Sequence, residues 1–287
     1  MKNFKNFKLK RFIYKLVINL VLSNEKIKKR VLAISSKVYA DIENFNYDPE
    51  SNGEYWLLKN LSTNYSETIL DIGANIGEYS LKCYKYFPKS KIYAIEASPK
   101  TYKKLIKNTS NVLNIFTINK ALSDSSEKKY FYERSDFSGR NTFEGKNTGL
   151  TYKNKIIIEL IKGDYFLSEE GIEENIKIMK VDVEGYELKV LKGFENSLKN
   201  FKIDIIQFER STAACTPSIF EFYDFLSPYG YYIGKLYPKY IEIYKNYKYT
   251  LEEYIGCNWI AVNKNSESFK SLNQKIKFID EPPRRIG

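Results

Sequence analysis

Short apolar runs alternate with stretches of helical periodicity from about residue 68 to the end of the chain. Four of the runs are compact and rich in Ile and Val, as buried strands are: TILDIG, KIYAIEA, IKIMKVDV and KIDIIQFE. Helical patterns follow them at 78–87, 99–108, 186–199 and 218–226. This alternation predicts an α/β fold with a mainly parallel sheet and helices on both faces. We expect three further strands, in VLNIFTINKAL, YYIGKLY and NWIAVNK.

The beginning of the chain has a different pattern. Apolar residues recur there at helical spacing with Lys and Arg between them, at Leu9, Phe12, Ile13, Leu16, Val17, Leu20 and Val21. We predict a basic amphipathic helical extension over residues 1–45, and a single catalytic domain over 46–287. The apolar run from Phe12 to Leu22 contains Lys15 and is too short to span a bilayer. Residues 8–34 therefore either bind an anionic membrane surface or form a helix that packs on its own domain.

A glycine-rich loop directly follows the first predicted strand. In DIGANIG, Gly73 and Gly77 let the backbone turn tightly and approach a ligand, and Asp71 precedes them in the strand. Glu96 lies nineteen residues after Gly77, at the end of the second strand, where an acid can accept hydrogen bonds from both hydroxyls of a ribose. Ligands of such sheets bind at the carboxyl ends of the strands. The sequence therefore predicts a nucleotide cofactor at this loop.

Two departures from the dinucleotide pattern indicate which cofactor it is. Asn75 stands where a pyrophosphate-binding loop needs glycine, and Asp71 would repel phosphates. An acid suits a cofactor that has an amino group and a sulfonium but no phosphate. We therefore predict that the cofactor is S-adenosylmethionine, bound at the glycine loop with Asp71 and Glu96.

A second motif, KVDVEGYE, ends the fourth predicted strand of the chain. Asp182 and Glu184 alternate at the end of this strand and Gly185 interrupts it before a helix begins. Acids at this edge of a sheet are costly to desolvate unless they have partners or a chemical role. The simpler alternative is that they cap the following helix, which suits Glu184 better than Asp182.

The amino-acid composition of the chain excludes several catalytic mechanisms. The chain has no histidine, which excludes a Ser-His-Asp triad, histidine-bound zinc and an imidazole base. Its three cysteines have no ligand spacing, so we expect reduced thiols and a cytoplasmic protein, peripheral at the inner face of the membrane if the extension binds there. The net charge of +11 arises mainly from Lys, which suits either an anionic partner or a solvated surface.

The motifs DIGANIGEYS, IEASP, KVDVEGYELKVLKGF and IIQFER, with NGEYWLLKNL upstream, resemble the FkbM family of S-adenosylmethionine-dependent O-methyltransferases. The resemblance covers about residues 50–265, so it gives no role to the extension. It implies a class I methyltransferase (Rossmann-like) fold whose seven-stranded sheet has an antiparallel last strand. It also implies methylation of a hydroxyl, often on a sugar or a glycosylated product, with Asp182, Glu184 and Gly185 between cofactor and acceptor. The cofactor site that the resemblance implies comprises Asp71, Gly73, Asn75, Gly77, Glu96, Ala97, Ala121 and Asp182.

A sugar hydroxyl is a poor nucleophile until its proton leaves, so a base is expected. Without histidine, the candidates are Asp182, then Glu209 at the end of the fifth strand, and Glu184. Glu209 could instead form an ion pair with its neighbour Arg210. A divalent cation held by Asp182 and Glu209 could replace the base by acidifying the hydroxyl.

The expected acceptor is a carbohydrate, either a nucleotide sugar or a glycan precursor. Arg134 and Arg140 flank a loop that could close over it, and with Glu184 they are the predicted acceptor-binding residues. Two other classes stay open. The basic charge would suit an RNA methyltransferase, although no RNA-binding module is recognisable and we expect no nucleic-acid partner. The second open class is a module that binds the cofactor but has no catalytic activity.

Overall fold

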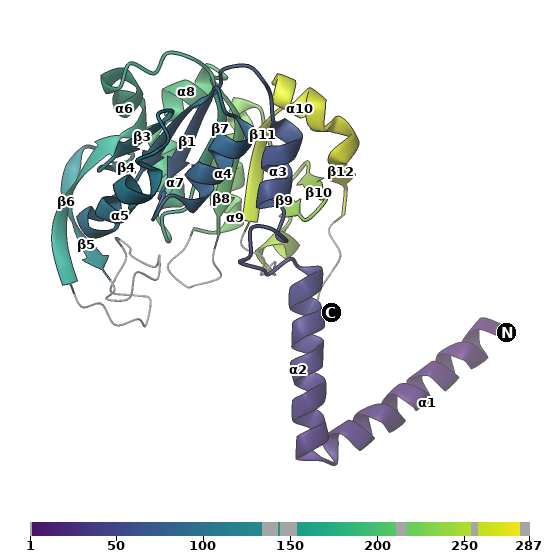
Figure 1. Cartoon of the computed structure of the whole chain (residues 1–287). Helices are drawn as coiled ribbons and strands as arrows, with labels where there is room; N and C mark the ends of the chain where they lie inside the picture. Colours follow the sequence, from purple (N-terminus) through teal and green to yellow (C-terminus); the bar gives the residue numbers. More distant parts are fainter. Residues whose placement is uncertain (1, 134–142, 144–153, 211–216, 254–257, 282–287) are drawn as a thin grey trace. The chain divides into compact units, whose positions relative to one another are not determined.

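The computed structural model describes residues 2–133, 143, 154–210, 217–253 and 258–281, with side chains from residue 10 onward (Figure 1). The chain divides into two compact units, Met1–Phe45 and Asn46–Gly287. The second unit contains both large hydrophobic clusters, whose members all lie beyond residue 54.

A nine-stranded sheet forms the centre of the second unit. Its strand order is β12-β10-β9-β11-β8-β7-β1-β2-β3. The strands β3, β2, β1, β7 and β8 are parallel, and β11 is antiparallel to both of its neighbours, β8 and β9. The bounds are β1 Thr68–Ile72, β2 Lys91–Ile95, β3 Ile115–Ile118, β7 Ile176–Val181, β8 Ile203–Glu209, β9 Tyr231–Tyr237, β10 Tyr240–Tyr244, β11 Asn258–Asn263 and β12 Ile276–Ile279.

Seven of these strands have the arrangement expected of a class I methyltransferase, which confirms the predicted fold. The expected count of seven was wrong, because β10 and β12 extend the edge beyond β9. β10 follows β9 after only Pro238 and Lys239 and pairs with it antiparallel, and β12 adds parallel to β10. Both strands are short, and their polar and partly exposed positions leave little of the apolar run that marks a buried strand.

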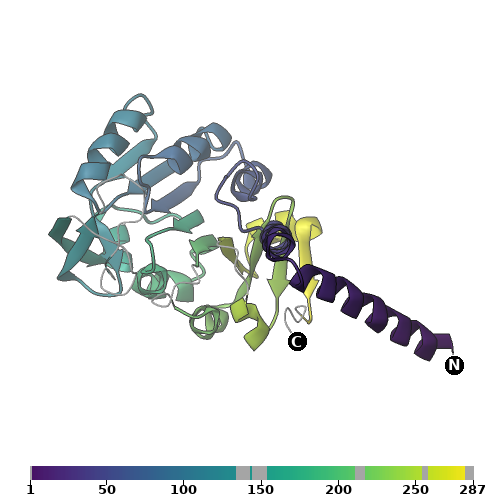
Figure 2. The same ribbon diagram turned by 90° about the horizontal axis from the view of Figure 1, so that it is seen from below.

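The two faces of the sheet are both buried, as strand residues alternate between two cores. In β1, Leu70 belongs to one hydrophobic cluster and Ile69 to the other. The first cluster includes residues of α6, α7, α8 and α9, and the second includes residues of α3, α4, α5 and α10 (Figures 1 and 2). The bounds are α3 Glu54–Leu61, α4 Glu78–Tyr86, α5 Pro99–Thr109, α6 Gly163–Glu169, α7 Glu187–Gly193, α8 Glu195–Lys199, α9 Ile219–Leu226 and α10 Glu267–Leu272.

Local sequence accounts for most helix boundaries. Ser98 caps α5 by accepting the Thr101 N–H, and Ser218 forms a capping box with Glu221 at the start of α9. The continuous helix expected over 186–199 is instead two helices, α7 and α8, that meet at Phe194. Phe194 is completely buried in the first core, so packing of its ring accompanies this break.

A small second sheet lies beside the main one, in the order β4-β6-β5. It is formed by β4 Ala121–Ser123, β5 Glu127–Glu133 and β6 Asn154–Lys162. The stretch VLNIFTINKAL, expected as one strand, is thus divided between β3 in the main sheet and β4 in the small one. Phe131 and Leu160 of the small sheet form a third buried cluster with Phe143 and Tyr186.

The first unit consists of α1 Lys2–Leu22 and α2 Glu25–Ile42. Asn24 separates the two helices and caps α2, because its side chain accepts the N–H groups of Lys26 and Ile27. Within the described residues, no helix is both long and apolar enough to cross a bilayer.

We predict that deletion of residues 1–40 leaves the second unit folded, since neither of its large cores uses this segment. Thermal unfolding followed by circular dichroism should change its midpoint by less than about 4 °C, equivalent to about 1 kcal/mol or less for a domain of this size. A larger drop would show that the helices pack on the catalytic unit.

Candidate active site

The loop between β1 and α4 is held in a conformation that its glycines permit. Gly73 has a φ of 86° and Gly77 a φ of 93°, both in the left-handed region. A Cβ on Gly73 would lie 1.9 Å from the carbonyl oxygen of Asp182, so the two loops approach too closely for any side chain there. Asn75 also has a positive φ, of 48°, which asparagine tolerates better than most residues.

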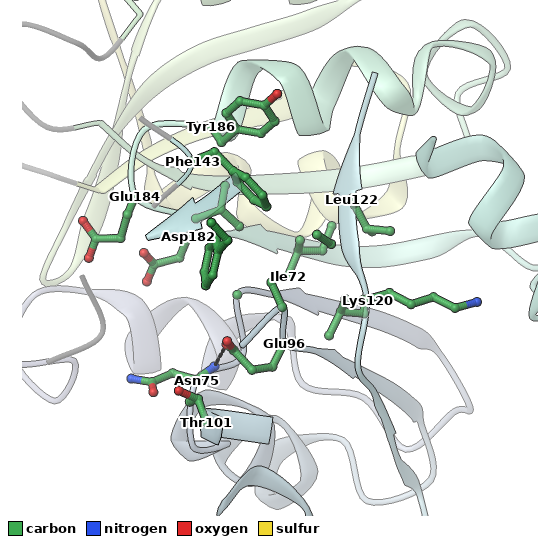
Figure 3. A pocket seen from close by; sticks show the side chains of 16 residues that line it. Ile72, Asn75, Glu96, Thr101, Lys120, Leu122, Phe143, Asp182, Glu184 and Tyr186 are labelled. Carbon is green, nitrogen blue, oxygen red and sulfur yellow. Dashed lines mark hydrogen bonds between the residues drawn. The ribbon is translucent and has the colours of Figure 1, made fainter. Parts of the chain in front are cut away.

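Glu96, at the end of β2, binds the same loop. One carboxylate oxygen accepts the Asn75 N–H at 3.0 Å and the other accepts the Ser98 N–H at 2.8 Å (Figure 3). Burial raises the pKa of Glu96 to about 7, although both backbone donors oppose the shift. The Glu96 side chain is therefore oriented before any ligand binds.

A pocket opens beside this loop, lined by residues from the ends of several strands. Figure 3 shows that Asn75, Glu96 and Thr101 line one side of it, and Asp182 and Glu184 another. Six of the residues predicted to bind the cofactor line this pocket: Gly73, Asn75, Glu96, Ala97, Ala121 and Asp182. The other two, Asp71 and Gly77, are not among its lining residues. Gly77 instead begins α4, where Leu105 and Thr109 leave no space for a Cβ.

Asp71 is completely buried, so its position does not support the expected direct contact with the cofactor amino group. One oxygen accepts a hydrogen bond from the Ser80 hydroxyl at 2.5 Å. Burial raises the pKa of Asp71, while the charge of nearby Lys180 opposes that rise. Asp71 is therefore paired with its own neighbours, Ser80 and Lys180, below the pocket lining.

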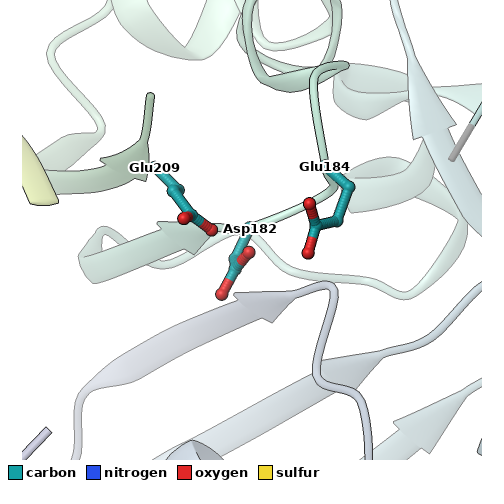
Figure 4. Close-up of side chains that lie close together, drawn as sticks. All are labelled: Asp182, Glu184 and Glu209. Atoms are coloured by element: carbon teal, nitrogen blue, oxygen red, sulfur yellow. The ribbon is translucent and has the colours of Figure 1, made fainter. Parts of the chain in front are cut away.

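Three carboxylates meet at the carboxyl ends of β7 and β8 (Figure 4). One oxygen from each of Asp182, Glu184 and Glu209 lies within 4.8 Å of the others. The sequence-based candidates for the base are thus brought together, although Glu209 is 27 residues from Asp182. The alternative in which Glu209 pairs with Arg210 is wrong: Arg210 forms its ion pair with Glu252, at 2.6 Å.

Lys180 determines where the charge lies in this cluster. Its Nζ is 2.7 Å from Asp182 Oδ2, and its side chain is only 12% exposed. Burial alone would raise the pKa of Asp182, but Lys180 and a hydrogen bond with Glu209 hold that pKa below its usual value. Burial and the Asp182 charge raise the pKa of Glu209. Within this pair, Lys180 therefore favours the ionised form of Asp182, and the Asp182 charge favours the protonated form of Glu209.

Glu187 stabilises the loop that carries Asp182 and Glu184. Its carboxylate accepts the N–H of Val183 at 3.1 Å and the N–H of Gly185 at 3.0 Å. Helix α7 has no side-chain cap, so the capping role considered for Glu184 is not found. Glu184, with a φ of 55°, lines the pocket instead. Sequence reasoning missed Lys180 and Glu187, although both lie within two or three residues of the motif acids.

Aromatic side chains cover the side of the pocket next to the small sheet. The rings of Phe131 and Tyr186 contact the ring of Phe143, with centroids 4.8 and 5.0 Å apart, and all three line the pocket. The predicted acceptor-binding residues Arg134 and Arg140 lie outside the described residues, so their role stays a prediction.

Among known protein families, one has a model that matches this chain. The family model for the methyltransferase FkbM domain matches residues 71–233, which is more than half of the chain. The chain belongs to the FkbM methyltransferase family. The matched range includes Glu96 and all three clustered carboxylates, and the strand order agrees with an S-adenosylmethionine-binding methyltransferase fold.

Two curated proteins resemble this FkbM methyltransferase in sequence. Hexuronic acid methyltransferase AglP of Haloferax volcanii is 27% identical over 190 residues, which are 61% of this chain and 75% of AglP. Methyltransferase sdnD of Sordaria araneosa is 30% identical over 159 residues, 44% of this chain and 60% of sdnD. Among solved structures, the fibrillarin pre-rRNA processing protein of Methanococcus jannaschii aligns with 77% of this chain and 78% of its own, at 14% identity and a TM-score of 0.43.

Replacing Gly73 by alanine should strongly weaken cofactor binding in this FkbM methyltransferase. The new Cβ would collide with the Asp182 carbonyl and push apart the two loops that form the pocket. Calorimetry should show affinity for S-adenosylmethionine at least about tenfold weaker, or about 1.4 kcal/mol. Gly171→Ala is the matched control, because Gly171 also has a positive φ, of 64°, but has nothing within 4 Å of the added Cβ. Equal losses in both variants would exclude the steric explanation.

Glu96→Ala should weaken S-adenosylmethionine binding by about 1–3 kcal/mol, the cost of leaving ribose hydroxyls without a charged acceptor. Because the raised pKa of Glu96 is about 7, its ionised form increases as pH rises from about 6 to 8, and affinity should rise with it. Titrations across this range check the slope. Glu96→Gln keeps an acceptor without a titration, so a slope that is unchanged in this variant would exclude Glu96 as its cause.

Proposed function

We propose that this FkbM methyltransferase transfers a methyl group from S-adenosylmethionine to a hydroxyl of a sugar, in a nucleotide sugar or a glycan precursor. The observation that carries the proposal is the position of ionised Asp182. It lines the same pocket as Glu96, and it belongs to a carboxylate cluster at the edge of that pocket.

Each side of the pocket suits one substrate. Glu96 and the backbone near Asn75 suit the ribose of the cofactor, because a carboxylate accepts hydrogen bonds from two adjacent hydroxyls. Asp182 and Glu184 come from the neighbouring strand end and suit the acceptor hydroxyl. Methyl transfer is an in-line displacement, so much of the rate can arise from holding the acceptor oxygen against the methyl carbon.

In the proposed reaction, Asp182 accepts the hydroxyl proton as the acceptor oxygen forms its bond to the methyl carbon. The bond from that carbon to sulfur breaks, and its electron pair stays on sulfur as S-adenosylhomocysteine leaves. A proton shared by the two acids is favoured on Glu209, which then donates a hydrogen bond to Asp182 and keeps Asp182 in the ionised form that can accept a proton.

A divalent cation is the second way to activate the hydroxyl, with Asp182, Glu184 and Glu209 as oxygen ligands. The Lys180 ammonium already balances the Asp182 charge, and a cation would have to displace the proton of Glu209. Both features weigh against a bound cation. Treatment with EDTA separates the two routes, because activity that collapses and returns with magnesium or manganese would require the metal.

The similarity to hexuronic acid methyltransferase AglP supports a carbohydrate acceptor. Assays with labelled S-adenosylmethionine should therefore compare nucleotide sugars, free glycosides with and without a uronic acid carboxylate, glycan extracts and RNA. Labelled carbohydrate would support the proposal. Label found only in RNA would replace it with a nucleic-acid methyltransferase, and cofactor binding without transfer to any acceptor would favour a non-catalytic module.

Asp182→Asn should lower turnover by roughly 100-fold or more while changing cofactor affinity much less. Asparagine keeps the shape of the side chain but cannot accept the proton or hold a negative charge. Turnover and cofactor affinity should be measured on the same preparation.

Glu209→Gln is the informative partner variant, because glutamine resembles the protonated Glu209 that the structure indicates. It should retain much more activity than Asp182→Asn. Near-normal turnover in Asp182→Asn combined with loss in Glu209→Gln would move the role of base to Glu209.

A further inference from the structure

The N-terminal extension, residues 1–45, carries most of the net charge of the protein. It contains 11 of the 46 Lys and Arg residues but only 3 of the 35 acidic residues, so it supplies +8 of the total charge of +11. The catalytic unit is therefore almost balanced. A charge concentrated in one short segment indicates an anionic partner for that segment.

Helix α2 combines this charge with a continuous apolar face. Ile27, Val31, Ile34 and Val38 are spaced so that they share one side of the helix, and their side chains are 38%, 39%, 65% and 50% exposed. The basic residues Lys26, Arg30 and Lys37 flank this face on one side, and Lys28 lies on the other. None of the side chains of α2, which is described throughout, is buried.

The two halves of helix α1 differ in composition. Its first half, to Arg11, is rich in Lys, and its second half, 12–22, is apolar apart from Lys15 and Asn19. The exposed apolar side chains of the second half are distributed around the whole helix, at 51–65% exposure: Phe12, Ile13, Tyr14, Leu16, Val17, Leu20 and Leu22. A helix that is apolar on all sides needs an apolar environment. At about 1.5 Å per residue, this half is about 16 Å long, far less than a bilayer core of about 30 Å.

We propose that the extension is a docking surface for an anionic phospholipid membrane. The apolar face of α2 and the second half of α1 enter the boundary between headgroups and acyl chains, and the Lys and Arg side chains contact the lipid phosphates. A second copy of the chain would fit this surface less well, because two segments of charge +8 repel each other.

Vesicle co-sedimentation of the full chain tests the proposal. Phosphatidylcholine vesicles with phosphatidylglycerol should bind the protein, and vesicles of phosphatidylcholine alone should bind much less. Raising the salt from about 0.1 M to about 1 M should weaken binding, because the Debye length falls from about 10 Å to about 3 Å. Equal binding to both vesicle types, or no binding to either, would overturn the proposal.

Substitutions separate the apolar contribution from the charge. The double variant Ile34→Gln and Val38→Gln keeps the charge but should lower binding by about tenfold or more. Its control is Leu113→Gln, which also makes an exposed apolar residue polar, since Leu113 is 92% exposed in the catalytic unit. Loss of binding in the control as well would contradict a specific role for α2.

A second comparison keeps the change in net charge constant. The triple variant Lys26→Gln, Arg30→Gln and Lys37→Gln should lower binding to anionic vesicles several-fold. The same number of charges is removed from the exposed surface of the catalytic unit by Lys89→Gln, Lys103→Gln and Lys239→Gln, which should bind nearly as well as the parent. Equal losses of vesicle binding in the two triple variants would show that only the overall charge of the protein matters, and this would overturn the proposal.

Two readouts show whether a failed variant is merely misfolded or reveals another partner. Unchanged S-adenosylmethionine affinity shows that the catalytic unit is intact in each variant. Analytical ultracentrifugation without lipid measures self-association. An oligomer that dissociates in the Ile34→Gln and Val38→Gln variant would assign the apolar face to a second copy and overturn membrane docking.

Discussion

The backbone contact between Gly73 and Asp182 joins the two halves of the site. Asp182 donates its N–H to the carbonyl of Ile72 at 2.9 Å, and its own carbonyl lies where a Gly73 side chain would be. This contact places the cofactor-binding loop after β1 directly against the acidic loop after β7. Because methyl transfer depends on the distance between two bound substrates, the spacing of these loops is the constraint on which the rest of the site depends.

A buried charge network lies under that contact. Lys180 carries a positive charge close to three carboxylates, and the charges of Asp182, Glu54 and Asp71 raise its pKa against the effect of burial. Each of these charges alone would be costly to remove from water, and together they offset one another. The network extends from Glu54, the first residue of α3, to Asp71 in β1 and Lys180 in β7. Lys180 in turn acts directly on the pKa of Asp182.

The two units of the chain differ in how their apolar residues are used. The catalytic unit buries them on both faces of its sheet, whereas α1 and α2 expose theirs between basic residues. The catalytic unit is also nearly balanced in charge. The basicity of the chain therefore says little about the acceptor, which we propose binds in the pocket of the catalytic unit.

The sequence by itself determined the local features: the parallel strands, the glycine loop, Glu96 at the end of β2 and the acids at the end of β7. Each depends on neighbours in the chain or on a pattern of buried residues, so it can be recognised without a structure. Only the tertiary structure showed that Asp182 and Glu209 are hydrogen-bonded to each other, because the distance between them depends on how β8 pairs with β7. It also placed Asp71 outside the pocket. It showed that Glu187 accepts backbone N–H groups of the loop that carries Asp182 and Glu184. The roles of these residues depend on burial and on contacts between strands, and the spacing of residues along the sequence does not specify either.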